Sequence, residues 1–181
     1  IAGHDVANTA GGRVSSEDAF ELTAARLDNH GGQIQSLGTT TLRVDDAIDN
    51  SSGVLRSARQ LAIDADRLIN SGSIDGQSLA LNARLLDNRA GALRAAQMLQ
   101  IASNGVIDNG AGLISSSVSL LIAAPAASTG QTPGASTLTL RNAHGTLIAD
   151  RQRVFDGVAV DGNGVLLSLG DLSISVLTDF S

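Results

Sequence analysis

The sequence predicts an all-β fold: a parallel β-helix of about eight coils of 18–21 residues, which we expect to be right-handed. Three features predict it. Asparagine recurs at a nearly constant interval, small residues follow most of these asparagines, and an apolar-x-apolar step lies about half a repeat later. Period-two alternation is typical of β-strands, and glycine and serine favour tight turns. Repeats of this length are typical of a solenoid whose coils bury their apolar side chains by stacking.

Asparagine defines the repeat. Eight of the ten asparagines follow one another at intervals of 21, 21, 20, 18, 21, 33 and 21 residues. Side-chain amides stacked at one place in successive coils can hydrogen-bond to one another, so we expect a structural ladder. Its expected members are Asn8, Asn29, Asn50, Asn70, Asn88, Asn109, Asn142 and Asn163.

Each coil is expected to continue from the asparagine turn into two strand segments. The first segment carries an apolar residue a few positions after the asparagine, and the second carries the apolar-x-apolar step. In the seventh coil the second segment is ambiguous, with Val154 or the pair Val158 and Val160 as alternatives. The first set is Val14, Ile34, Val54, Ile74, Leu93, Leu113, Leu147 and Val165, and the second is Phe20/Leu22, Leu42/Val44, Leu61/Ile63, Leu79/Leu81, Leu99/Ile101, Leu120/Ile122 and Leu172/Ile174.

Two segments also fit a different secondary structure. Residues 54–69 and 85–101 have the spacing of amphipathic helices when considered alone. They are in frame with residues 27–47, where paired glycines and a run of threonines disfavour a helix. Because equivalent repeats should share one conformation, strands are the favoured prediction.

The long interval of 33 residues has a simple explanation. Residues 125–136 contain both prolines, and removing these 12 residues restores an interval of 21. We therefore expect residues 1–181 to be one β-helix segment of a longer chain, with regular coils over 6–124, a loop insertion at 125–136 and looser coils over 137–181. Loops on rigid scaffolds often carry binding, although a tolerated insertion is the simpler alternative. The candidate binding residues are Pro125, Thr129, Gln131 and Pro133.

Composition excludes several classes of function. The formal net charge is −6, aromatic residues make up 2%, and cysteine and lysine are absent. We therefore expect no nucleic-acid partner, no thiolate metal site and no cysteine nucleophile. No run of apolar residues is long enough to span a bilayer.

No motif of nucleophilic or nucleotide chemistry occurs either, so we expect no catalytic residue, no metal and no cofactor. Four aspartates share one position of the coil and are expected to form turns rather than a calcium site. They are Asp28, Asp49, Asp87 and Asp108. The three histidines are expected to be isolated at the surface. The nearest approach to a polysaccharide-cleaving cluster is Asp150, Arg151, Arg153 and Asp156, for which a solvated turn is the simpler interpretation.

The repeated phrase Leu27-Asp28-Asn29-His30-Gly31-Gly32 and its echoes at residues 48–53, 86–91 and 107–112 resemble coils of filamentous haemagglutinins and contact-dependent growth-inhibition exoproteins. The resemblance implies a rigid, non-enzymatic shaft of a large secreted surface filament used in cell–cell or cell–host contact. It also implies an outer-membrane transporter of the two-partner pathway, and a cell-surface receptor or glycan as a further partner. The alternative is a carbohydrate-binding or polysaccharide-degrading β-helix.

Overall fold

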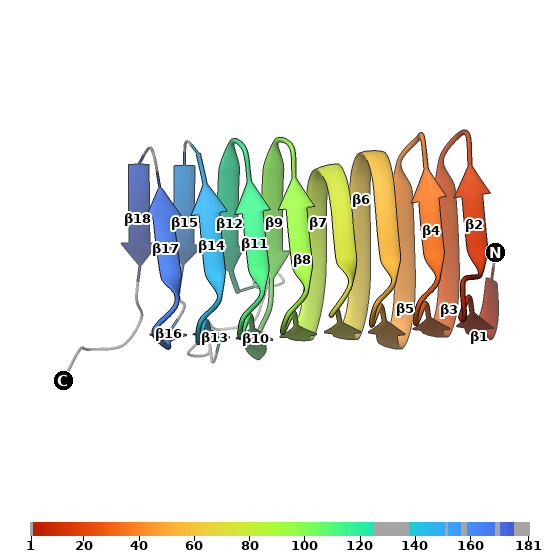
Figure 1. Ribbon diagram of the computed structural model, residues 1–181, viewed down its shortest axis with the longest axis horizontal. Helices are drawn as coiled ribbons and strands as arrows, with labels where there is room; N and C mark the ends of the chain where they lie inside the picture. Colours follow the sequence, from red (N-terminus) through yellow and green to blue (C-terminus); the bar gives the residue numbers. More distant parts are fainter. Residues whose placement is uncertain (1, 125–137, 151, 157–158, 169–170, 176–181) are drawn as a thin grey trace, which may run out of the picture.

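The computed structural model describes all residues except 1, 125–137, 151, 157–158, 169–170 and 176–181. Every regular element in the described part is a β-strand, and all strand pairs are parallel, which confirms the predicted fold class (Figure 1). The strands are β1 (Ala2–Ala7), β2 (Arg13–Ser16), β3 (Phe20–Asp28), β4 (Gln33–Ser36), β5 (Thr40–Asp49), β6 (Val54–Ile69), β7 (Ser73–Asp87), β8 (Ala92–Ala95), β9 (Met98–Ala102), β10 (Val106–Asp108), β11 (Leu113–Ser116), β12 (Ser119–Ala123), β13 (Thr139–Arg141), β14 (Thr146–Ala149), β15 (Gln152–Asp156), β16 (Ala159–Asp161), β17 (Val165–Ser168) and β18 (Asp171–Ser175).

Each strand pairs with the equivalent strand of the next coil, so the strands form three faces. The chain makes about seven turns, close to the expected eight coils. Successive coils lie side by side along the long axis of the molecule (Figure 1). Face 1 contains β2, β4, the starts of β6 and β7, β8, β11, β14 and β17; face 2 contains the first parts of β3 and β5, the later parts of β6 and β7, β9, β12, β15 and β18; face 3 contains β1, the ends of β3, β5, β6 and β7, β10, β13 and β16.

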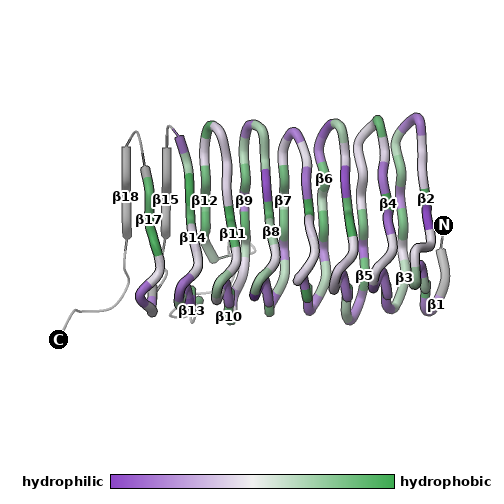
Figure 2. The backbone as a smooth tube through the Cα atoms, in the orientation of Figure 1, coloured by the Kyte–Doolittle hydropathy of each residue, from purple (hydrophilic) through white to green (hydrophobic). Residues whose placement is uncertain are grey.

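The core is a set of apolar columns that run along the rod. Side chains alternate between interior and surface along β4, β9 and β12, as their burial shows. Figure 2 shows hydrophobic and hydrophilic residues interspersed along the coils. Fully burying one leucine or isoleucine contributes ~1.5–3 kcal/mol, and here that burial depends on the coils above and below. Face 1 contributes Ile34, Leu55, Ile74, Leu93, Ile114 and Leu147 to the columns; face 2 contributes Leu22, Leu42, Ile63, Leu81, Ile101 and Ile122; and face 3 contributes Leu27, Ile48, Leu68, Leu86, Ile107 and Leu140.

The two segments with helical spacing are strands. Residues 54–69 form β6, and residues 85–101 contain the end of β7, all of β8 and most of β9. β6 and β7 pair along most of their lengths, with one irregularity between Ser57 and Gln60. Pairing on both sides therefore prevails over the local helix propensity of alanine, leucine and arginine.

At several apolar positions the predicted interior residue differs by one from the residue that the register places in the core. Val54, Leu113 and Val165 point outward, while the register puts Leu55, Ile114 and Leu166 in the column. In each case two apolar residues are adjacent, so the pattern could not decide which one faces the core.

Two of the apolar pairs predicted for face 2 also differ from the observed register. Leu61 aligns with Thr40, and Ile63 aligns with Leu42. The expected pair Leu42/Val44 therefore lies two residues too far along the strand, and the aligned pair is Thr40/Leu42. In the seventh coil the register places Phe155, and not Val154, beside Ile122. Of the alternative pair, Val160 aligns with Leu140, which belongs to face 3 rather than face 2.

The coils before and after the insertion are direct neighbours. β10 pairs with β13, with Val106 opposite Thr139. Strand pairing between these two coils is therefore continuous although residues 125–137 separate them in the sequence. The candidate binding residues Pro125, Thr129, Gln131 and Pro133 lie outside the described residues.

Candidate functional site

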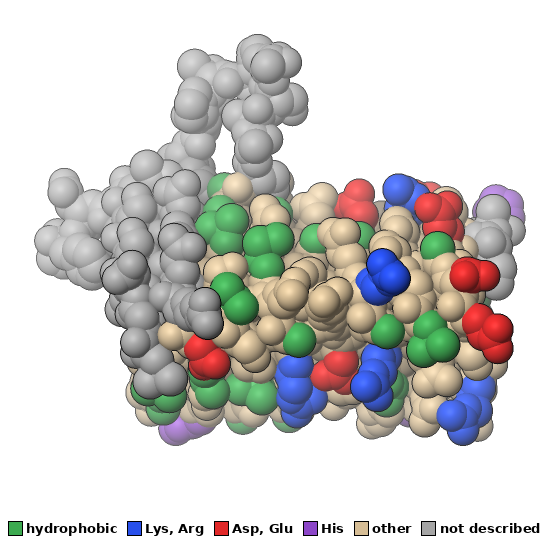
Figure 3. All heavy atoms as spheres, turned by 90° about the horizontal axis from the view of Figure 1, so that it is seen from above, with side chains coloured by type: hydrophobic (Ala, Val, Ile, Leu, Met, Phe, Trp, Pro, Cys, Tyr) green, Lys and Arg blue, Asp and Glu red, His purple; other side chains and the backbone are tan. Residues whose placement is uncertain are grey.

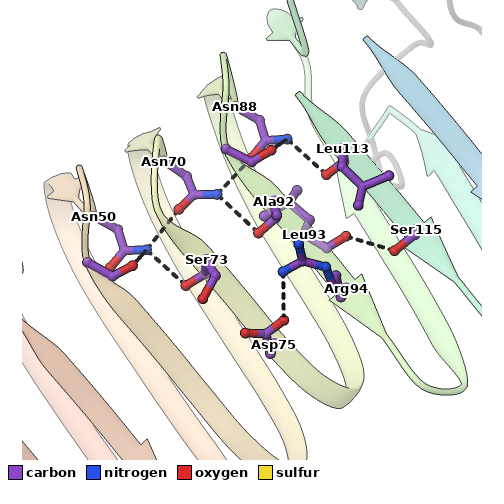
Figure 4. Close-up of polar contacts among 12 residues, drawn as sticks. Asn50, Asn70, Ser73, Asp75, Asn88, Ala92, Leu93, Arg94, Leu113 and Ser115 are labelled. Carbon is purple, nitrogen blue, oxygen red and sulfur yellow. Dashed lines mark hydrogen bonds and ion pairs between the residues drawn. The ribbon is translucent and has the colours of Figure 1, made fainter. Parts of the chain in front are cut away.

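A row of asparagine side chains runs along the rod, at the corner of each coil between face 3 and face 1. From Asn8 to Asn109, each Nδ2 donates a hydrogen bond to the Oδ1 of the next asparagine in the row, one coil later. Figure 4 shows the bonds from Asn50 to Asn70 and from Asn70 to Asn88. The six N–O distances are 2.7 to 2.8 Å. The row therefore reproduces, in side chains, the hydrogen-bond pattern of the parallel backbone beside it. We call it the asparagine ladder; its members are Asn8, Asn29, Asn50, Asn70, Asn88, Asn109 and Asn142.

The amides of the asparagine ladder are buried and satisfied. Asn29, Asn50, Asn88 and Asn109 are 0% exposed. The second proton of Nδ2 points to backbone carbonyls: that of Asn50 to Ser73, and that of Asn88 to Leu113. A buried amide is costly unless it is bonded, so each rung is stable only while its neighbouring coils are in place.

Glycine completes the turn that follows most of these asparagines. Gly53, Gly91, Gly112 and Gly145 each come three residues after a ladder asparagine. A Cβ atom on Gly91 would lie 2.0 Å from the backbone oxygen of Asn70, so the close approach of two coils excludes any side chain there. The spacing of three residues between asparagine and glycine is visible in the sequence and is a more specific signal than glycine near asparagine.

The aspartates before the asparagines act within the same turns. Oδ1 of Asp28, Asp49, Asp87 and Asp108 accepts a hydrogen bond from the backbone N–H two residues later, at 2.8 to 3.1 Å. This is the geometry of an aspartate-stabilised turn. Among the described residues, no group of three or more histidine, aspartate or glutamate side chains is arranged to hold a metal ion.

Asn163 does not continue the asparagine ladder. β16 aligns Asp161 with Arg141, so Gly162 occupies the position equivalent to Asn142. Asn163 is exposed, and its Oδ1 accepts a hydrogen bond from the His144 N–H at 3.2 Å. The interval of 21 residues from Asn142 was therefore a coincidence of spacing, because this turn has a different arrangement.

At the other corners of the coil, buried serine hydroxyls donate hydrogen bonds to backbone oxygens. Ser57 Oγ donates to the Gly38 oxygen at 2.7 Å, and Ser116 Oγ donates to the Gln97 oxygen at 2.7 Å. Ser103 plays the same part at the third corner through the Arg84 oxygen. The sequence predicts only turn positions for these serines, since no sequence pattern distinguishes the buried ones from the exposed ones.

Ion pairs connect neighbouring coils at the surface. Arg26 pairs with Asp46 at 2.6 Å, and Arg84 pairs with Asp66 through two hydrogen bonds. Within one turn, hydrogen bonding from Arg89 holds the pKa of the Asp87 carboxyl below its usual range. On the side of the molecule seen in Figure 3, acidic and basic side chains of the described residues are interspersed.

The outer surface of face 2 is hollowed between β5, β6, β7 and β9. A hollow of about 330 Å³ has Ala62 and Ala80 on its floor, with Thr41 and Gln100 at opposite ends. A neighbouring hollow of about 620 Å³ shares its Arg43, Asp64 and Asn82. No sequence motif predicts this surface, because its lining residues come in short groups from four coils.

The candidate catalytic side chains, namely the histidines and the charged cluster near Asp150, are not brought together in the described part of the chain. Of the predicted cluster near Asp150, the backbone at Arg151 and the side chains of Arg153 and Asp156 lie outside the described residues. His30 and His144 are exposed and lie in different coils. No helix long and apolar enough to cross a membrane occurs in the described part of the chain.

Comparison with known proteins identifies one family. A family model described as "Haemagglutinin repeat" matches residues 1–52, 38–84 and 56–177. Neither the curated proteins nor the solved structures contain a match to the chain. The matched ranges together cover nearly all of the chain, and they include the whole asparagine ladder.

Proposed function

The chain belongs to the haemagglutinin repeat family, and from that premise we propose that it is a rigid shaft segment of a large, secreted bacterial surface filament. The shaft holds other regions of the filament away from the cell for contact with bacteria or host cells. Its own contribution is mechanical and involves no catalytic step.

The asparagine ladder is the observation that carries this proposal. Six consecutive hydrogen bonds between buried side-chain amides keep the coils in one register, including the pair Asn109 and Asn142 on either side of the insertion. A slip by one residue would break these bonds and turn the apolar columns outward. The coils are thus held as one stiff unit, which is what a spacer requires.

Export through the two-partner pathway is part of the same proposal. A filament of this kind reaches the cell surface through a dedicated outer-membrane transporter, and it folds outside the cell. The absence of cysteine is compatible with passage in an unfolded state, since no disulfide has to form or break.

Cell binding tests the shaft proposal. The labelled chain is added to bacteria of the producing strain and to host epithelial cells, with excess unlabelled chain as competitor. A shaft predicts no saturable, competed binding to either cell type. Saturable binding that the competitor abolishes would contradict it and would identify an adhesive module.

The hollowed surface of face 2 favours a second candidate function. Arg43, Asp64 and Gln100 present charged and hydrogen-bonding groups around a floor of alanines, an arrangement suited to a hydroxyl-rich ligand such as a glycan. A glycan array with the wild-type chain and the Arg43→Ala variant tests it. Binding lost in Arg43→Ala but retained in Arg56→Ala, on face 1, supports the adhesive function; binding insensitive to Arg43 excludes this surface.

A further inference from the structure

Three asparagines of the chain are followed directly by glycine: Asn104, Asn109 and Asn163. At such a step the backbone nitrogen of glycine can attack the side-chain amide carbon of asparagine, because glycine has no Cβ to obstruct the approach. The product loses the amide nitrogen as ammonia. The same dipeptide occurs in three different settings, so the fold decides which of the three reacts.

Asn109 is held against this reaction from both sides. Its side chain is 0% exposed and is fixed by its neighbours in the asparagine ladder, with Nδ2 donating to Asn142 Oδ1 at 2.8 Å. The attacking nitrogen is held as well, since the Gly110 N–H donates to Asp108 Oδ1 at 3.0 Å. Attack would require both hydrogen bonds to break, and a neighbouring carboxylate disfavours the deprotonated nitrogen.

Asn104 is exposed, yet its glycine is also held. The Gly105 N–H donates to Ser103 Oγ at 3.2 Å. Ser103 is 1% exposed, and its hydroxyl donates to the Arg84 oxygen, which fixes its orientation. In both Asn104 and Asn109, the residue before the asparagine therefore supplies the acceptor that occupies the glycine N–H.

Asn163 differs in this respect. The residue before it is Gly162, which has no side chain and cannot supply that acceptor. Asn163 is exposed, and its Oδ1 accepts a hydrogen bond from the backbone N–H of His144 at 3.2 Å. A donor on this oxygen stabilises the negative charge that develops there when the amide carbon is attacked.

We propose that Asn163 is a site of spontaneous deamidation in the folded protein, and that the fold retards the reaction at Asn104 and blocks it at Asn109. The Gly164 nitrogen gives its proton to water and bonds to Cγ of Asn163. The bond from Cγ to Nδ2 then breaks, and the nitrogen leaves as ammonia after taking up a proton. Water opens the resulting cyclic imide to aspartate or isoaspartate.

The modification changes the last described turn. Aspartate adds one negative charge between β16 and β17, to a chain whose formal charge is already −6. Isoaspartate in addition lengthens the backbone of the turn beside Gly164, where a Cβ would lie 1.9 Å from the Asn142 oxygen. Packing this tight leaves little room for a longer backbone, so the modified turn is expected to loosen with the age of the protein.

Peptide mass spectrometry of the folded chain, aged at mildly alkaline pH, tests the proposal. We expect Asn163 to convert first, Asn104 to convert roughly fivefold more slowly because one hydrogen bond must be released, and Asn109 to remain unchanged. In denaturant the three rates should converge. Equal rates at Asn163 and Asn104 in the folded chain, or the same order in denaturant, would overturn the proposal.

Ser103→Ala tests the protecting hydrogen bond, with Ser117→Ala as the control because Ser117 is exposed. We expect Ser103→Ala to raise the rate at Asn104 roughly fivefold and to leave Asn109 unchanged. No rise at Asn104, or an equal rise at Asn109 that reveals general opening of the coil, would contradict the assigned role of Ser103.

Discussion

Replacing Asn88 by alanine removes one rung from the middle of the asparagine ladder. Asn88 Oδ1 accepts from Asn70, and Asn88 Nδ2 donates to Asn109 and to the Leu113 oxygen. The site is 0% exposed, so water does not replace these partners in the folded state. The variant therefore leaves a donor of Asn70 and an acceptor of Asn109 unpaired in the interior.

The size of the effect follows from these groups. An unsatisfied buried donor or acceptor costs ~1–3 kcal/mol, and two are created. We expect the free energy of unfolding to fall by about 3–5 kcal/mol, a loss at the upper end for single substitutions. The matched control is Asn82→Ala on the exposed side of the neighbouring strand segment, where one surface hydrogen bond to Asp64 is lost. That change should cost less than about 1 kcal/mol.

Urea denaturation followed by far-ultraviolet circular dichroism measures both variants. The midpoint should move strongly for Asn88→Ala, and the slope of the transition should stay constant if unfolding remains cooperative. Repeat proteins can unfold in parts, so a split transition at the affected coil would also agree with the reasoning. A loss for Asn88→Ala as small as that for Asn82→Ala would refute it.

Three further outcomes are expected. Ala90 and Ala111 have φ values of +56° and +54°, so Ala90→Gly and Ala111→Gly should each stabilise the chain by ~0.5–1 kcal/mol in urea unfolding, whereas Ala92→Gly, within β8, should destabilise it. Thr40 Oγ1 is buried without a partner in the described structure, so Thr40→Val should raise the free energy of unfolding by ~1 kcal/mol, and a loss would show a hidden partner. Hydrogen bonding from Arg89 lowers the pKa of Asp87, so this carboxylate stabilises the fold above its unfolded-state pKa, and the contribution is lost as pH falls through the lower folded-state pKa. Asp87→Asn should therefore flatten the acid side of the stability–pH profile, and an unchanged profile would contradict this.

The periodicity of the sequence was sufficient to predict the solenoid and its strands. Asparagine at nearly constant spacing marks one corner of each coil, and the segments with helical spacing could be assigned to strands because they are in frame with glycine- and threonine-rich repeats. Long-range pairing decides the conformation of residues 54–69, and a repeat makes that pairing visible in the sequence.

The sequence did not determine which side chains point into the core and which lie on the surface. Where two apolar residues are adjacent, as at Val54-Leu55, only the register shows which one enters the core. Turns that differ by one or two residues shift that register, which is also why Asn163 misses the asparagine ladder. The hollowed surface of face 2 combines outward residues such as Arg43 and Gln100 from coils far apart in sequence, and outward positions carry no periodic signal.

The in-register stack is the central claim, and a single distance tests it most directly. Thr9 and Ala143 are exposed and directly follow the first and last members of the asparagine ladder, six rungs apart. Because the chain has no cysteine, spin labels can be placed at Thr9→Cys and Ala143→Cys alone and their separation measured by electron double resonance. A stack with ~4.8 Å per rung predicts a narrow distribution near about 29 Å. A broad distribution, or a peak displaced by several rungs, would contradict a continuous rod.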